Sequence, residues 1–99
     1  MKIVLNAIAK QELDDAVEYY ELQLAGLGKR FKREVKESLL RIQQAPTIWI
    51  REKEEIHRYL MHKFPYKILY SIESDHVFII AIAHTHRRPN YWIDRILET

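Results

Sequence analysis

The residues that could carry chemistry lie in the second half of the chain. All five histidines fall between residues 56 and 92: His57, His62, His76, His84 and His86. The stretch ends in basic and aromatic residues, among them Arg87 and Tyr91. An imidazole titrates near neutral pH and can also ligate a metal ion. Any chemistry that this chain performs is therefore expected here.

His84 and His86 are the candidates for a metal site, since alternate residues of a strand share one face. The chain has no cysteine, and no carboxylate lies near them in the sequence to complete a ligand set. His62 could join them only if the fold brings it there. We therefore expect hydrogen-bonding histidines at a strand end, without a metal or other cofactor. The sequence contains no phosphate-binding glycine loop and no serine nucleophile motif.

The charges are unevenly distributed, although the net charge is only +2. Residues 1–55 carry ten basic and ten acidic side chains, whereas residues 56–99 carry six basic and four acidic ones. The excess lies beside the histidines and predicts a patch for nucleic acid or, equally, for an acidic protein. A solvated surface of mixed charge stays open as the alternative at so small an imbalance.

The length of 99 residues predicts one domain, 1–99, with a single core. The absence of cysteine excludes disulfides and thiolate metal sites. The N-terminal residues become acidic and amphipathic too early for a signal peptide, and no segment is long and apolar enough to span a membrane. We expect a soluble cytoplasmic protein that does not associate with membranes.

Alternating and β-branched runs predict four strands, at residues 2–6, 56–63, 66–72 and 77–83. Pro65 separates the second strand from the third, and a polar turn joins the third to the fourth. The run VFIIAIA of the fourth strand is apolar on both faces. It is therefore expected to be a central strand that is covered on both sides.

A first helix is predicted after the opening strand. Apolar residues keep helical spacing from Leu13 to Leu24, and acidic residues from Glu12 onward lie in its first turns, where the helix dipole favours them. Gly26 and Gly28 are expected to end the helix, because glycine suits the left-handed conformation of helix caps.

A second helix is predicted over residues 29–44, and Pro46 prevents its continuation. The two helices form a hairpin whose apolar sides need the sheet as cover. The second helix starts with a basic run made of Lys29, Arg30, Lys32, Arg33 and Lys36. Such a run is usually a solvated face, and that is the interpretation favoured here.

The remaining segments are a loop and a short terminal helix. Residues 46–55 form the loop, and three large apolar side chains are expected to pack from it over the sheet edge: Ile48, Trp49 and Ile50. Residues 90–97 predict a helix whose apolar side is made by Trp92, Ile93, Ile96 and Leu97. The fold class is α+β: an N-terminal strand, a helical hairpin packed on an antiparallel sheet of about four strands, and a short C-terminal helix.

Motifs along nearly the whole chain carry a family resemblance. They are Tyr19-Tyr20, Gly26-Leu27-Gly28-x-Arg30-Phe31, Pro46, Arg58-Tyr59-Leu60, Phe64-Pro65-Tyr66-x-Ile68-x-Tyr70 and His84-x-x-Arg87-x-Pro89-x-Tyr91-Trp92. In this order they resemble the RelE/ParE superfamily of toxins from bacterial type II toxin–antitoxin modules, which include plasmid-stabilisation modules. The resemblance implies the same α+β fold and a cognate antitoxin that wraps the toxin. The second face of the central strand would be closed either by that antitoxin or by the terminal helix and the Trp49 loop.

The superfamily contains two kinds of activity. RelE-like toxins cleave messenger RNA on the ribosome with the RNA's own 2′-hydroxyl as nucleophile, whereas ParE-like toxins poison DNA gyrase. If the chain is RelE-like, the resemblance implies a metal-independent endoribonuclease. Its catalytic residues would by position be Arg58, Lys67, Arg87 and Tyr91, with His84 or His86 as alternative acid or base.

Several residues depart from the RelE pattern. Leu60 stands where a second lysine is expected, Lys67 stands where an arginine is usual, and Thr85-His86-Arg87 does not align with the basic loop of the ribosomal nucleases. The glycine turn and the Pro89-Asn90-Tyr91-Trp92 ending look more ParE-like. We therefore expect a growth-inhibiting toxin that acts on gyrase and is neutralised by its antitoxin. The alternatives are RelE-like cleavage of messenger RNA and a non-toxic module that only binds an antitoxin.

Overall fold

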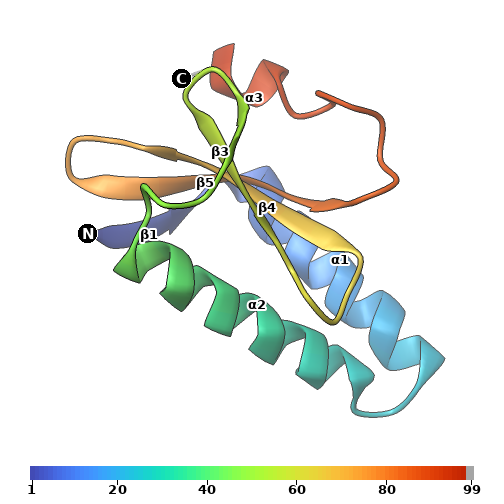
Figure 1. Cartoon of the computed structure of the whole chain (residues 1–99). Helices are drawn as coiled ribbons and strands as arrows, with labels where there is room; N and C mark the ends of the chain where they lie inside the picture. The colour runs from blue at the N-terminus through green and yellow to red at the C-terminus, as the bar shows by residue number, and fades with distance from the viewer. Residues whose placement is uncertain (98–99) are drawn as a thin grey trace.

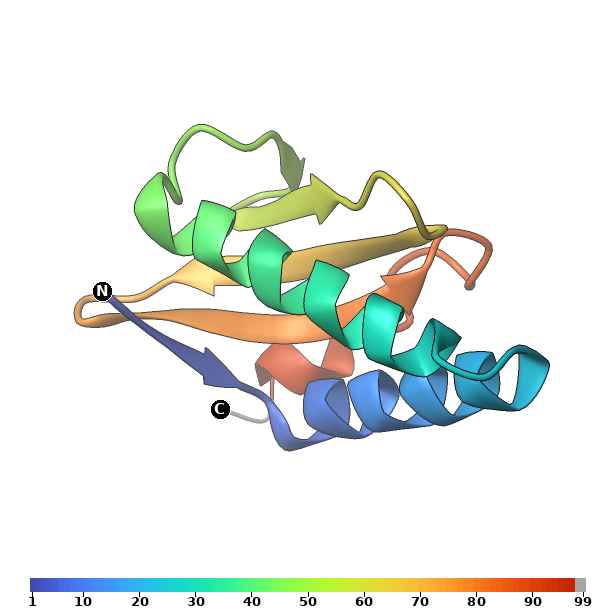
Figure 2. The same cartoon turned by 90° about the horizontal axis from the view of Figure 1, so that it is seen from below.

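A five-stranded sheet carries a helical hairpin on one face and a short helix on the other (Figures 1 and 2). The computed structural model describes residues 1–97. In chain order the elements are β1 (Lys2–Leu5), α1 (Ala7–Gln23), α2 (Leu27–Gln44), β2 (Arg51–Lys53), β3 (Ile56–Leu60), β4 (Tyr66–Ile72), β5 (His76–His84) and α3 (Asp94–Leu97). The strand order is β1-β5-β4-β3-β2, with β1 parallel to β5 and the other pairs antiparallel. The expected α+β architecture is confirmed.

β2 is a strand that the sequence pattern did not predict. Arg51 pairs with His57 and Lys53 with Ile56, with an irregular register between them. The three residues are all charged, so they lack the alternation of apolar and polar side chains that indicates a strand. The expected loop over residues 46–55 is therefore wrong at its end, and the sheet has five strands instead of about four. β3 is also shorter than expected, since it ends at Leu60.

α1 begins earlier than the acidic residues suggested. Its first residue is Ala7, and the side chain of Asn6 caps it by accepting a hydrogen bond of 2.7 Å from the backbone N–H of Ile8. The first turn contains no acidic residue, so Glu12 lies beyond the part of the helix that the dipole argument concerns. The side chain of Glu12 instead bonds to the sheet, at the backbone N–H of Ile82.

The turn between the helices uses its two glycines differently. Gly26 has φ 89°, the left-handed conformation that glycine adopts without strain. Gly28 instead lies inside α2 and is buried, so the expectation that it ends α1 is wrong. A Cβ atom at Gly28 would lie 2.5 Å from the carbonyl oxygen of Val17, which means that α1 and α2 touch here through their backbones. The Glu21 carboxylate accepts hydrogen bonds from the N–H groups of both glycines, at 2.8 and 3.0 Å, and so caps α2.

β5 lies between β1 and β4 and is buried on both faces, as its apolar run predicted. The core between the sheet and the hairpin, here the hairpin core, contains Phe31, Val35, Ile42, Ile68, Tyr70 and Ile79 among others. The core on the opposite face, here the terminal core, consists of Ile56, Leu69, Ile80, Ala81 and Trp92. Trp92 is a packing residue, as expected, with 1% of its surface exposed.

The loop before β2 does not help to close the terminal core. Trp49 packs in the hairpin core, with its ring centroid 4.7 Å from that of Tyr59. Ile48 and Ile50 are exposed, so the expectation that all three residues pack over the sheet edge is wrong for these two. The terminal core is instead covered from the segment around α3, with Ile93 and Ile96 at its margin. The side chain of Leu97, expected to take part, lies outside the described residues. Within the described chain no helix is both long and apolar enough to cross a membrane.

Candidate functional site

Arg58 and Lys67 lie close together on the face of the sheet opposite the hairpin. Arg58 pairs across the strands with Leu69, and Lys67 precedes Leu69 by two residues, so all three share that face. Both cations bind the carboxylate of Glu52 on β2, Arg58 at 3.1 Å and Lys67 at 2.6 Å. The side chain of Glu52 is only 13% exposed. The structure therefore places these two predicted residues in one ion cluster, with Glu52 as their shared partner.

The protonation of Glu52 reflects this cluster. Burial raises the pKa of the Glu52 carboxyl, but the hydrogen bonds from Lys67 and Arg58 outweigh burial and hold it below its ordinary value. Glu52 is therefore ionised at neutral pH and compensates part of the charge of both cations. Glu52 was not predicted as a site residue, because the strand that carries it has no periodic pattern.

Arg87 and Tyr91 form a second group beside α1. The guanidinium of Arg87 stacks 3.9 Å from the ring centroid of Tyr91, in cation–π geometry. The Tyr91 hydroxyl donates a hydrogen bond of 2.5 Å to Glu12. Burial, followed by the contact with the Glu12 carboxylate, raises the pKa of the Tyr91 phenol well above its usual range. Near neutral pH this phenol keeps its proton, and that proton is directed at Glu12.

Glu12 connects the second group to the sheet edge. Its carboxylate accepts two hydrogen bonds from Arg95 of α3, at 2.9 and 3.0 Å, and one of 3.1 Å from the backbone N–H of Ile82. Arg95 also donates to the carbonyl oxygen of Ile80 at 3.0 Å. The pairing of β1 with β5 ends at Ile79. Glu12 and Arg95 thus satisfy backbone groups of β5 where its neighbouring strand is missing.

The histidines do not form a metal site within the described chain. No group of three or more histidine, cysteine or acidic side chains that could hold a metal ion is found among the described residues. His84 accepts a hydrogen bond of 3.1 Å from the backbone N–H of His86, and the two rings lie 5.2 Å apart. His57 is buried and stacks on Tyr70, and its Nδ1 donates to the carbonyl oxygen of Trp49 at 2.8 Å. His57 therefore acts as a tether for the loop before β2.

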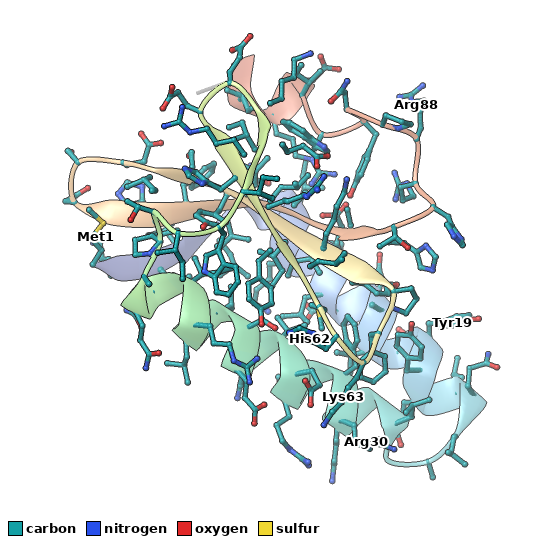
Figure 3. The ribbon with its side chains drawn as sticks, in the orientation of Figure 1. Met1, Tyr19, Arg30, His62, Lys63 and Arg88 are labelled. Carbon is teal, nitrogen blue, oxygen red and sulfur yellow. The ribbon has the colours of Figure 1, made fainter. Side chains whose placement is uncertain are left out.

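A cleft of about 260 Å³ between α1 and the end of β5 brings His84 and Arg87 together. Its lining also includes Glu12 and Tyr19 of α1 and Tyr66 of β4. Tyr19 is labelled in Figure 3. Arg58 and Lys67 do not line this cleft. The predicted catalytic residues thus fall into two groups, each organised by a carboxylate.

A larger cavity of about 530 Å³ lies under the loop before β2. Its lining includes Trp49, Arg51, His57, Ser71 and Glu73 and none of the predicted site residues. His57 is the only histidine among these lining residues.

The arrangement limits the chemistry that these residues can perform. Attack by a 2′-hydroxyl needs a group that accepts its proton, and it needs cations free to face the phosphate. Tyr91 is committed to Glu12, and the two strand cations are committed to Glu52. Of the four predicted residues, Arg87 remains exposed at the surface beside the cleft.

Comparisons with known proteins identify the fold and the family of this chain. No curated protein sequence matches the chain significantly. Among solved structures, the chromosomal ParDE toxin–antitoxin system from P. aeruginosa is similar at 12% identity and a TM-score of 0.65, over 85% of this chain and 95% of that chain. The isolated E. coli RelE toxin is similar at 18% identity and a TM-score of 0.63, over 96% of this chain and 97% of that chain. These likenesses establish the shared fold. The family model of the ParE toxin of the type II toxin–antitoxin system parDE matches residues 3–89, and the chain therefore belongs to the ParE toxin family.

Proposed function

We propose that this chain inhibits bacterial growth by acting on DNA gyrase and that a cognate antitoxin neutralises it. Membership of the ParE toxin family supports a toxin of this kind. The observation that carries the choice of target is the commitment of Tyr91, Arg58 and Lys67 to carboxylates of the chain itself. A ribosome-dependent nuclease would need these groups free for RNA. A protein that poisons gyrase by binding needs no such catalytic set.

The test is induced expression in a bacterial host that lacks the antitoxin. Growth is followed while transcript ends and gyrase-trapped DNA breaks are mapped in the same cells. We expect trapped breaks together with intact transcripts. Ribosome-phased RNA cuts would overturn the proposal, and a folded protein without any growth defect would point to a module that only binds the antitoxin.

Two variants sharpen this test. Tyr91→Phe removes the hydroxyl that a nuclease would use, and Lys67→Ala removes a strand cation. If the target is gyrase, both variants stay toxic once their melting temperatures show that they are folded at the growth temperature. Arg87→Ala is the variant to compare with these two, because the side chain of Arg87 is exposed and can contact a target.

Membership of the ParE toxin family of the type II toxin–antitoxin system supports the binding of an antitoxin. Leu22, Leu24, Ile48 and Leu60 are each more than half exposed, at 78%, 62%, 66% and 59%. These residues lie at the end of α1, in the loop before β2 and at the end of β3, and single exposed apolar residues of this kind are common at protein surfaces. Co-expression with the product of a neighbouring gene is expected to restore growth and to yield a complex that purifies as one species. Separate elution of the two proteins would contradict this part of the proposal.

A further inference from the structure

The side of α2 that points away from the sheet is strongly basic. Five exposed cations lie on it, here called the α2 cationic face: Lys29, Arg30, Lys32, Arg33 and Lys36. At about 100° of rotation per residue these positions share one side of the helix. The opposite side carries Phe31, Val35 and Ile42, which are buried in the hairpin core. The packing of α2 on the sheet therefore holds the five cations in solvent on one rigid element.

The cations of this face have no acidic partners in the part of the chain that the structure describes. Elsewhere, cations such as Lys10, Lys63 and Arg95 form ion pairs with carboxylates. Glu34, one of the two acidic residues of α2, is turned to Lys63 at 3.3 Å and is 17% exposed. Glu37 is then the acidic side chain left to the exposed side of the helix. The face consequently keeps most of its positive charge.

This charge is unfavourable for α2 itself. Lys29 and Arg30 lie in the first turn of the helix, where the dipole is positive, and the five cations repel one another at spacings of three and four residues. The N-terminal backbone N–H groups of Gly26 and Gly28 are already occupied by Glu21. Packing of the fold therefore gains nothing from the run of cations. Its unpaired charge is complementary to an anionic partner, so such a partner is an alternative to the solvated face that the sequence favoured.

The composition of the face indicates which anion it fits. Its five members include no apolar or aromatic side chain, and the next exposed apolar residue on that side is Leu40, beyond the run. Protein interfaces have apolar and aromatic centres, and unpaired bases are bound by stacking on aromatic rings. Phosphates of a duplex need only lysine and arginine. We infer that the α2 cationic face binds the phosphate backbone of duplex DNA without sequence preference. The inference goes beyond the proposed function and does not depend on gyrase.

Fluorescence anisotropy of the purified chain with a labelled DNA duplex of arbitrary sequence tests this inference. If three to four phosphates are contacted, affinity falls roughly 40- to 150-fold between about 50 mM and about 200 mM salt. The variant Lys29→Ala/Arg33→Ala/Lys36→Ala is expected to lose most of that salt dependence, about 0.9 of the log–log slope for each lost contact. Thermal unfolding is the check that this variant is folded. Its melting temperature is expected to rise, because charges that repel one another are removed.

The matched control removes the same net charge from other surfaces. Lys2→Ala/Lys53→Ala/Arg88→Ala is suitable because all three residues are exposed, and Figure 3 shows Arg88 far from Arg30 of the α2 cationic face. This control is expected to keep the wild-type slope. An equal loss in both variants would overturn the inference, since net charge alone would then explain binding. Tighter binding of polyglutamate or of duplex RNA than of DNA would also overturn it, as would the absence of salt-dependent DNA binding in the wild type.

Discussion

Glu52 and Glu12 bind three of the four predicted site residues, Arg58, Lys67 and Tyr91. Each carboxylate is about seven-eighths buried and holds two or more donors, Arg58 and Lys67 in one case and Tyr91 and Arg95 in the other. An ionised carboxylate at this depth is stable only with such partners. The same contacts take these donors out of competition for an external phosphate.

Glu52→Gln is expected to lower stability by about 1 kcal/mol near neutral pH, because the charge that holds Arg58 and Lys67 is lost while the amide keeps the shape. For a chain of this length that corresponds to a melting temperature lower by about 4–8 °C. The pKa of Glu52 is lowered by folding, so its contribution is complete above the ordinary value of 4.5 and is lost as the pH falls through the lower folded value.

The difference in melting temperature between wild type and Glu52→Gln should therefore shrink as the pH falls below the ordinary value of 4.5 and through the lower folded value. Thermal unfolding followed by circular dichroism across this range measures it. Glu55→Gln is the matched control, since Glu55 is 82% exposed and its contact with Arg51 is 3.6 Å long, and it is expected to have no effect. A difference that does not change with pH would rule out an ionic role for Glu52.

The sequence indicated the basic residues of the site but not their partners. Arg58, Lys67, Arg87 and Tyr91 were selected by position within family motifs, and the structure groups them in pairs. Glu12 precedes Tyr91 by 79 residues, and Glu52 lies on a charged strand that its own pattern does not predict. Neither the spacing nor the periodicity of the sequence reveals these contacts. Only the structure shows that three of the predicted site residues already bind carboxylates of the chain itself.

At the scale of elements, the edge of β5 beyond Ile79 is the feature that the fold must protect. Glu12 of α1 and Arg95 of α3 bind the backbone of Ile82 and Ile80 and bind each other. Unpaired edge groups invite strand addition by other chains. The clasp of Glu12 and Arg95 closes this edge and at the same time fastens α3 to the rest of the molecule.

Glu12→Gln is expected to loosen α3 and to cost about 2–4 kcal/mol, because Arg95 is then left nearly buried without a counter-charge. Hydrogen exchange should reveal it as faster exchange of the Ile82 amide and of the amides around α3. Asp15→Asn on the same helix is the control, since Asp15 is exposed and accepts a hydrogen bond from Gln11, also in α1. Unchanged exchange at Ile82 would show that the clasp does not secure the edge.

The contact between α1 and α2 gives a second prediction for the elements. A methyl group at Gly28 would lie 2.5 Å from Val17 O and 2.9 Å from Glu21 Cβ, so Gly28→Ala must push the helices apart. We expect a loss of about 1–3 kcal/mol in urea unfolding, despite the better helix propensity of alanine. Lys32→Ala, at an exposed position of the same helix, is expected to have no such cost. A Gly28→Ala variant as stable as the wild type would mean that the helices can separate freely.

The elements themselves were largely predictable. β4 runs from Tyr66 to Ile72 as the alternation of its residues indicated, and β5 extends one residue beyond its apolar run at each end. β2 escaped because a three-residue charged edge strand is defined by its pairing with β3 and not by its own pattern. The role of Gly28 escaped for a similar reason: a glycine at a helix contact and a glycine at a helix end look alike in one sequence.

At the scale of the whole molecule, the sheet separates two cores that share β5. Trp49 belongs to the hairpin core and Trp92 to the terminal core, so each face carries one natural fluorescent probe. Ile79 and Ile82 of β5 face the hairpin core, and Ile80 and Ala81 face the terminal core. Loss of packing on either face therefore withdraws support from the same strand, and we expect the two cores to unfold together.

Two single-tryptophan variants test this cooperativity. Trp49→Phe leaves Trp92 as the probe of the terminal core, and Trp92→Phe leaves Trp49 as the probe of the hairpin core. In each variant, urea unfolding followed by fluorescence and by far-ultraviolet circular dichroism is expected to give the same midpoint, because a two-state domain shows coincident transitions. The comparison is made within one variant, so any loss of stability from the substitution cancels. In Trp49→Phe, the fluorescence of Trp92 could instead change at a lower urea concentration than the circular dichroism of the helices. That result would show that α3 and the terminal core unfold first. The hairpin core would then stay folded without the contacts of Glu12 and Arg95 at the edge of β5.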